Sequence, residues 1–205
     1  MGTVTSLEGH RQARLAAMAT GRHAAPRATL YFDLGTPHTY LAAERAERLF
    51  ARLAWLPAAA DVLQARTLGE EDRRAVRERA ALLGLPFVWP EDSPHRAHGA
   101  MRVASLAAQR GRGAAFALAA SRLAFCGGFD IEDPEILAEA AAAAGIGLRD
   151  ALAAAGDVAR DGPIEETGRQ LLAAGATRLP VLRVGRTLFC GEDRLVEAAA
   201  ARAAV

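Results

Sequence analysis

The segment LYFDLGTPHTYLAAERAERLF, residues 30–50, joins a buried strand directly to an amphipathic helix. The apolar, aromatic-containing run 28–34 is typical of a buried strand. Pro37 suits the first turn of a helix, where the missing backbone N–H is not needed. The residues after it repeat apolar side chains at helical spacing, with charged ones between. A second apolar run, 53–59, then completes a β-α-β unit whose crossover length suits parallel pairing.

The rest of the chain is mostly helical until its last 30 residues. The run 178–185, a turn at Gly185-Arg186 and the run 187–190 predict a β-hairpin, followed by a final helix. Proline and turn residues in 83–96 predict an extended connection. The helices expected between the two strand regions are 70–83, 98–110, 113–127, 134–144, 148–155 and 164–174.

This order, β-α-β, a block of helices, then α-β-β-α, predicts an α/β fold. We expect a thioredoxin-like sheet with an all-helical domain inserted in its middle. The expected division is an N-terminal extension at 1–25, a thioredoxin-like domain at 26–69 and 164–205, and an inserted helical domain at 70–163.

Composition excludes several classes of function. The net charge of +1 gives no argument for binding nucleic acid or an acidic membrane surface. Apolar runs are shorter than the roughly 18–20 residues of a membrane span, and the first 25 residues lack the long apolar core of a secretory signal. Cys126 and Cys190 are not in CxxC form, so no disulfide framework is predicted. We expect a cytoplasmic protein that binds a small molecule and holds no metal.

Four segments, taken in order, resemble a known family. They are YFDLGTPHTYLA, GLPFVWP, GGFDIEDPEILAEAAAAAGI and TRLPVL…LFCGEDRL, which together span roughly residues 28–200. The chain resembles the DsbA-like branch of the thioredoxin superfamily, most closely 2-hydroxychromene-2-carboxylate isomerases and kappa-class glutathione transferases. The resemblance implies that glutathione or another low-molecular-weight thiol binds, that the substrate is a small molecule, and that the protein is a homodimer.

The turn after the first strand departs from DsbA-like oxidoreductases, which have C-P-H-C where this chain has Thr36-Pro37-His38-Thr39. Thiol–disulfide exchange needs one thiol to attack and a second to resolve the mixed disulfide, so this turn does not catalyse it. In the isomerases and kappa transferases a serine before the proline holds the glutathione sulfur. Thr36 is in that position, and the alternative is that its hydroxyl merely caps the helix.

His38 is the second catalytic candidate, since a histidine can polarise a thiolate or act as a base near pH 7. Its alternative is an ordinary surface residue, and Thr39 and Tyr40 are expected on the helix surface and in the core. Asp33 is either a proton relay or a hydrogen-bonded structural carboxylate.

The late proline and the final helix supply the predicted thiol-binding residues. By resemblance, Pro180 is a cis-proline opposite the turn, and the backbone of Leu179 pairs with the ligand's main chain as a strand would. Glu192, Asp193 and Arg194 match the segment that contacts the γ-glutamyl end of glutathione. Asp193 would receive the ligand's ammonium group. Glu192 would repel a ligand carboxylate unless Arg194 offsets it, and Arg194 could instead pair with Asp193.

Two departures weaken a direct transfer of function. The family's site uses an asparagine and a lysine after the second strand, and this chain contains neither residue type. Gln64 and Arg66 are possible replacements, and Trp89 could line the pocket or belong to the core. Two hypotheses therefore stand: a thiol-dependent isomerase or transferase, and a catalytically inactive thioredoxin-like binding module.

Overall fold

A mixed four-stranded sheet lies at the centre of the molecule, with strand order β2-β1-β3-β4. The computed structural model describes residues 28–63, 68–90 and 97–203, so the expected extension at 1–25 and the candidates Gln64 and Arg66 lie outside the described residues. β1 runs parallel to β2 and antiparallel to β3, and β3 and β4 form the predicted hairpin. The strands are β1 (Ala28–Phe32), β2 (Ala54–Pro57), β3 (Val181–Val184) and β4 (Thr187–Cys190).

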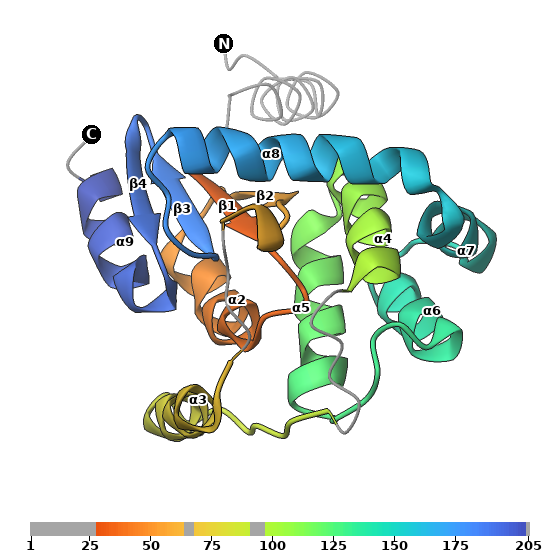
Figure 1. Ribbon diagram of the computed structural model, residues 1–205, viewed down its shortest axis with the longest axis horizontal. Coiled ribbons are helices and arrows are strands. Elements are labelled where there is room, and N and C mark those ends of the chain that lie inside the picture. Colours follow the sequence, from red (N-terminus) through yellow and green to blue (C-terminus); the bar gives the residue numbers. More distant parts are fainter. Residues whose placement is uncertain (1–27, 64–67, 91–96, 204–205) are drawn as a thin grey trace, which may run out of the picture.

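Helices cover both faces of the sheet (Figure 1). α2 (Pro37–Leu49) and α9 (Leu195–Ala203) pack against each other on one side, and α8 (Asp161–Ala173) runs past the other. The inserted helices pack beside the β2 edge, with α3 set apart from the others below α2. They are α3 (Glu70–Leu82), α4 (His98–Gln109), α5 (Gly113–Phe125), α6 (Pro134–Ala143) and α7 (Leu148–Gly156). Short 3₁₀ turns are η1 (Asp61–Leu63), η2 (Val158–Arg160) and η3 (Glu192–Arg194).

Alternating side chains of β1 divide the core into two layers. Leu30 and Phe32 belong to a large cluster that continues through α2 into the inserted helices as far as Phe116 of α5. Tyr31 points the other way and packs with Leu171 of α8 in a smaller cluster. The sheet and the inserted helices thus share one continuous core, and the domain division expected from chain order stays a prediction.

The elements agree closely with those expected, which confirms the α/β fold with helices inserted between two parts of a sheet. Most boundaries differ by one to three residues, and two of the differences have a clear structural reason. α8 begins at Asp161 rather than at residue 164, since η2 leads into it without a break. The final helix begins with η3, so the two acids of its predicted first turn lie in a 3₁₀ turn instead.

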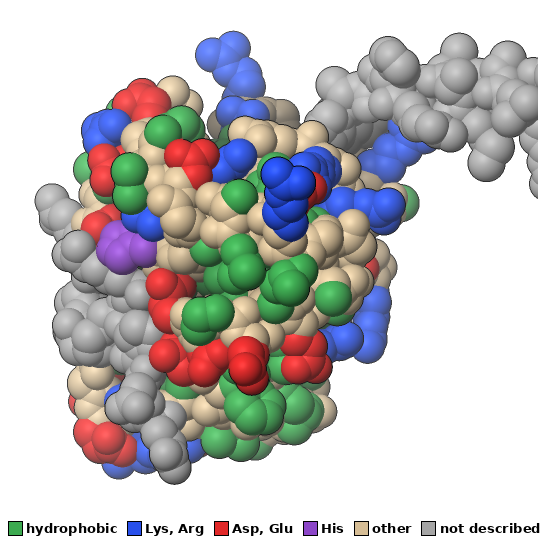
Figure 2. Space-filling view, turned by 90° about the vertical axis from the view of Figure 1, so that its right-hand side faces the viewer, with side chains coloured by type: hydrophobic (Ala, Val, Ile, Leu, Met, Phe, Trp, Pro, Cys, Tyr) green, Lys and Arg blue, Asp and Glu red, His purple; other side chains and the backbone are tan. Residues whose placement is uncertain are grey.

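The outer face of the inserted helices is partly apolar. Leu148 and Leu152 of α7 and Val158 of η2 are exposed, and Figure 2 shows apolar side chains gathered in the middle of this face beside a row of acidic ones. The homodimer implied by the resemblance stays a prediction. Among the described residues, no helix is long and apolar enough to cross a membrane.

Gly168 allows α8 to approach the loop after β2, and its substitution tests this packing. A Cβ there would lie 2.8 Å from the carbonyl oxygen of Ala59, whereas one at Gly162 of the same helix would meet nothing within 4 Å. We expect Gly168→Ala to lower the free energy of unfolding by about 1–3 kcal/mol. Gly162→Ala, the control, should change it by less than about 1 kcal/mol. Urea denaturation of the two variants measures this, and equal effects would contradict the packing.

Candidate functional site

The pairing of β1 with β3 brings the turn before α2 to the same end of the sheet as Pro180. Tyr31, near the end of β1, lies opposite Val181 at the start of β3. The peptide bond between Leu179 and Pro180 is cis. The Pro180 carbonyl accepts a 2.7 Å hydrogen bond from the Gly191 N–H, which brings η3 to the same place.

Thr36 occupies the N-cap position of α2, but its side chain does not cap the helix. Its backbone is extended (φ −112°, ψ 131°), and its carbonyl accepts a hydrogen bond from the Thr39 N–H. Within the described parts of the chain the Thr36 hydroxyl has no hydrogen-bond partner, so the capping alternative is not what the structure shows. The first turn of α2 contains no acidic residue. An uncommitted hydroxyl therefore lies at the positive end of a helix.

The second threonine of the turn has a different role from the first. Thr39 is fully buried, although it was expected on the helix surface. Its hydroxyl donates a 2.6 Å hydrogen bond to the Asp33 carbonyl and accepts one of 3.3 Å from the Asp33 N–H. That expectation was wrong because the helix begins immediately beside the strand end, which needs a partner for its backbone groups. Tyr40 is in the core, as predicted.

The Asp33 carboxylate holds the turn against the loop after β2. One oxygen accepts a 2.8 Å hydrogen bond from the Gly35 N–H, and the other accepts one of 2.9 Å from the Ala60 N–H. Burial raises the pKa of this carboxyl, and the two backbone donors oppose that rise. These contacts favour the structural alternative for Asp33 over the proton relay.

His38 lies in the first turn of α2, partly buried. Burial lowers the pKa of its imidazole. The carboxylates of Glu192 and Asp193 oppose this effect and Arg178 adds to it, which indicates that these three side chains lie near His38. The imidazole is accordingly neutral near pH 7, the form that can accept a proton.

The buried side chain of Glu192 connects three elements, η3, α2 and α3. Its side chain is only 6% exposed and receives 2.7 Å ion pairs from Arg45 of α2 and Arg79 of α3. The expectation that Glu192 would present an uncompensated charge to a ligand is therefore wrong, since two guanidinium groups neutralise it. Neither arginine was singled out from the sequence, where both read as ordinary charged positions on helices.

Asp193 and Arg194 are both paired, but not with each other. Arg178 donates to both carboxylate oxygens of Asp193, at 2.8 and 2.9 Å. Arg194 pairs with Glu197 in the next turn, so the sequence-based alternatives for Arg194, offsetting Glu192 or pairing with Asp193, were both wrong. Arg178 is a site residue that the sequence analysis missed, because nothing local links it to an acid 15 positions later.

Leu179 directly precedes Pro180 and has a buried side chain, 5% exposed. Among the described residues, no backbone hydrogen bond involves Leu179. The pairing of this main chain with an extended ligand, which the resemblance implies, stays a prediction.

Apolar side chains line the other side of the turn. A shallow hollow beside Leu34 and Gly35 is bordered by Phe125, Phe129 and Ile131.

Trp89 packs on Phe87 with ring centroids 5.0 Å apart, and the guanidinium of Arg73 lies 4.4 Å from its ring centre. Trp89 thus belongs to an aromatic cluster and does not line this hollow.

Comparison with known proteins shows the family of the chain. The family model of the DSBA-like thioredoxin domain matches residues 28–201. The chain belongs to the DSBA-like thioredoxin family. A comparison with curated protein sequences finds no significant match. The DSBA-like assignment agrees with the predicted resemblance, and the turn of this member lacks both thiols. Its two cysteines are free and partly buried.

Solved structures share the fold at low sequence identity. A 2-hydroxychromene-2-carboxylate isomerase is 18% identical with a TM-score of 0.70, over 86% of this chain and 95% of that one. A probable DsbA oxidoreductase from Streptomyces coelicolor is 19% identical with a TM-score of 0.69, over 86% and 89%. The cytosolic disulfide reductase DsbM from Pseudomonas aeruginosa, solved with GSH, is 20% identical with a TM-score of 0.60, over 86% and 95%.

Glu192→Gln tests the buried ion pairs of Glu192. Removing the charge leaves Arg45 and Arg79 facing each other without a counterion, so we expect the free energy of unfolding to fall by about 3 kcal/mol. Glu197→Gln removes the partner of the exposed Arg194 and should lower the free energy of unfolding far less, because water screens an exposed ion pair. Urea denaturation compares the two, and similar losses would show that Glu192 is not a buried charge.

His38→Gln tests the neutral state of the imidazole. Because the folded-state pKa lies below the ordinary value near 6.5, the unfolded chain binds the extra proton. The stability that neutral His38 contributes is complete above pH 6.5 and is lost as pH falls toward the folded-state pKa. Between pH 7.5 and 5 the wild type should therefore lose more stability than His38→Gln. Equal losses of stability in the two proteins over this pH range would contradict the prediction. The control is His98→Gln, which removes an exposed histidine instead.

Proposed function

We propose that the protein is a thiol-dependent isomerase of the 2-hydroxychromene-2-carboxylate isomerase type or a kappa-like glutathione transferase, and not a dithiol oxidoreductase. One observation carries the proposal: the Thr36 hydroxyl lies at the N-terminus of α2 without a partner among the described residues. A hydroxyl that served as a cap would already be occupied.

The residues of the turn are suited to hold a sulfur anion. The first N–H groups of α2 have no intrahelical acceptor, and the helix dipole favours negative charge there. The Thr36 hydroxyl can donate one further hydrogen bond to the same point. The same field lowers the pKa of thiols at helix starts. Bound glutathione or a similar thiol would supply the nucleophile.

Neutral His38 and the Leu179 backbone complete the arrangement. An unprotonated imidazole nitrogen of His38 can take the proton that a thiol releases. The main chain of Leu179, which makes no backbone hydrogen bond among the described residues, would orient an extended ligand beside Pro180.

The neighbours support this proposal through the fold they share. Among them are an isomerase and a reductase solved with GSH. Isomerisation and transfer both begin from an ionised thiol. They differ in whether the sulfur leaves again or stays attached to the substrate. The residues described here serve either reaction.

Thr36→Val removes the hydroxyl at nearly constant shape and is the direct test. Ten millimolar glutathione with a dissociation constant near 1 mM should stabilise the wild type by about 1.4 kcal/mol, a rise of about 3–5 °C in melting temperature. Thr36→Val should lose most of this rise and the activity with it. Thr36→Ser should keep both.

The control is Thr187→Val, on the exposed start of β4 away from the turn. Because the Thr36 hydroxyl does not cap α2, Thr36→Val without ligand should unfold within about 0.5 kcal/mol of the wild type. Full turnover by Thr36→Val would contradict the proposal. Glutathione binding without turnover on any thiol-reactive substrate would indicate the inactive binding module.

A further inference from the structure

Arg178 forms an ion pair with Asp193, the acid to which the resemblance assigns the ammonium group of glutathione. Its guanidinium contacts both oxygens of Asp193, and the two side chains are 58% and 50% exposed. Arg178 precedes Pro180 by two residues, and both members of the pair act on the pKa of His38. The pair therefore borders the proposed thiol site.

The loop backbone is shaped to admit this ion pair. Gly191 has a positive φ of 99°. A Cβ at Gly191 would lie 2.4 Å from an Asp193 oxygen and 2.6–2.7 Å from the Arg178 nitrogens Nε and Nη2. Any other residue would therefore collide with the pair as well as strain the backbone. The Gly191 N–H is held by the Pro180 carbonyl, which fixes this close approach beside the bend.

The other charged side chains next to the pair already have partners of opposite charge. Glu192 is shared by Arg45 and Arg79, and Arg194 is neutralised by Glu197. An ammonium group arriving at Asp193 would have to displace the Arg178 guanidinium and would then lie close to it. A carboxylate meets the opposite situation, because a guanidinium has five N–H donors and Asp193 does not use them all.

We propose that Arg178 occupies the place on Asp193 that a ligand ammonium would take, so that the site selects thiols bearing a carboxylate without a free amine at that end. The inference rests on the proposed function and makes it more specific. It reverses the expectation drawn from the resemblance, in which Asp193 receives the ammonium of glutathione.

Two ligands that differ only in the amine test this selection. Glutaryl-cysteinylglycine is glutathione without its α-amino group, and titration calorimetry at pH 7.5 gives the dissociation constant of each. The wild type should bind the deaminated thiol at least as tightly as glutathione. Arg178→Gln exposes Asp193, so the preference should shift toward glutathione by about threefold to fivefold, the size of one half-exposed charged contact.

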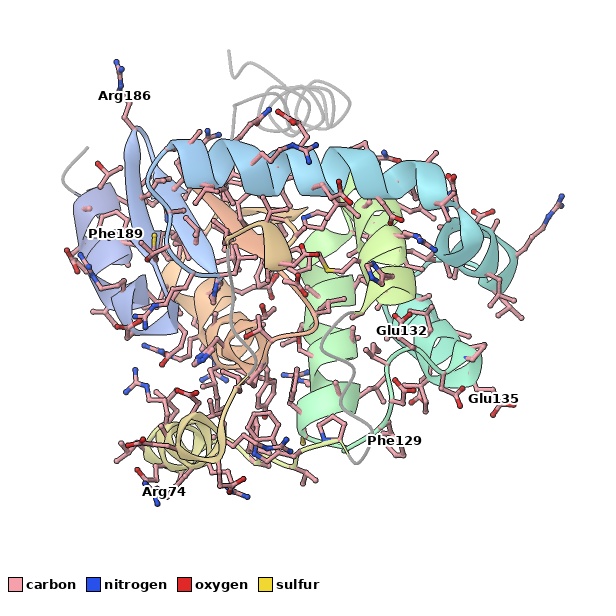
Figure 3. The ribbon with its side chains drawn as sticks, viewed as in Figure 1. Arg74, Phe129, Glu132, Glu135, Arg186 and Phe189 are labelled. Carbon is pink, nitrogen blue, oxygen red and sulfur yellow. The ribbon has the colours of Figure 1, made fainter. Side chains whose placement is uncertain are left out.

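Arg186→Gln is the matched control. Arg186 is exposed at the tip of the β3–β4 hairpin and points away from the molecule (Figure 3). Its loss changes the net charge by the same amount and should leave the preference as in the wild type. A similar shift in this variant would mean that overall charge sets the preference, and it would overturn the proposal.

The remaining outcomes separate the two proposals. Tenfold tighter binding of glutathione by the wild type, or an unchanged preference in Arg178→Gln, would overturn the role of Arg178 while leaving thiol binding intact. Failure of the wild type to bind either ligand would overturn both proposals. Melting temperatures without ligand verify that Arg178→Gln is folded, and the exposure of the pair predicts only a small shift.

Discussion

The antiparallel pairing of β1 with β3 determines where every candidate residue lies. It pairs Tyr31 with Val181, two residues that the inserted helices separate in the sequence. Side chains alternate along a strand, so a slip of one residue would turn Leu30 and Phe32 out of the larger core. The burial that fixes this register also fixes the distance between the turn and Pro180. The geometry of the site is therefore maintained by the core of the whole protein, to which the contacts of Asp33 and Thr39 add local support.

A second constraint connects the site to the inserted helices. Through Arg79, the charge of Glu192 holds α3, which packs little against the rest. Through Arg45 it holds α2, the helix that begins at the turn. The same carboxylate thus secures the start of η3, the body of α2 and the end of α3. The position of α3 beside the site depends more on these ion pairs than on apolar burial, since only Val76 and Ala80 of that helix are buried.

Local patterns carried most of the fold prediction. Helical spacing, proline at helix starts and the Gly185-Arg186 turn gave elements within a few residues of those observed. The site was harder to predict, because its roles depend on which side chains meet after folding. Thr36 and His38 could be found from their place before and within a helix. Arg178 could not, since its acid lies beyond a complete hairpin, and neither could the two arginines on Glu192.

The buried hydroxyl of Thr39 also bears on whether this turn could carry a pair of thiols. A cysteine at this position would replace a good donor and acceptor with a weak one, which would weaken both of its hydrogen bonds to the backbone of Asp33. Restoring C-P-H-C by two substitutions would therefore unsettle the strand end on which the turn rests. The second threonine of the turn is therefore part of the structure of the strand end, and dithiol chemistry at this turn would need a new partner for the Asp33 N–H.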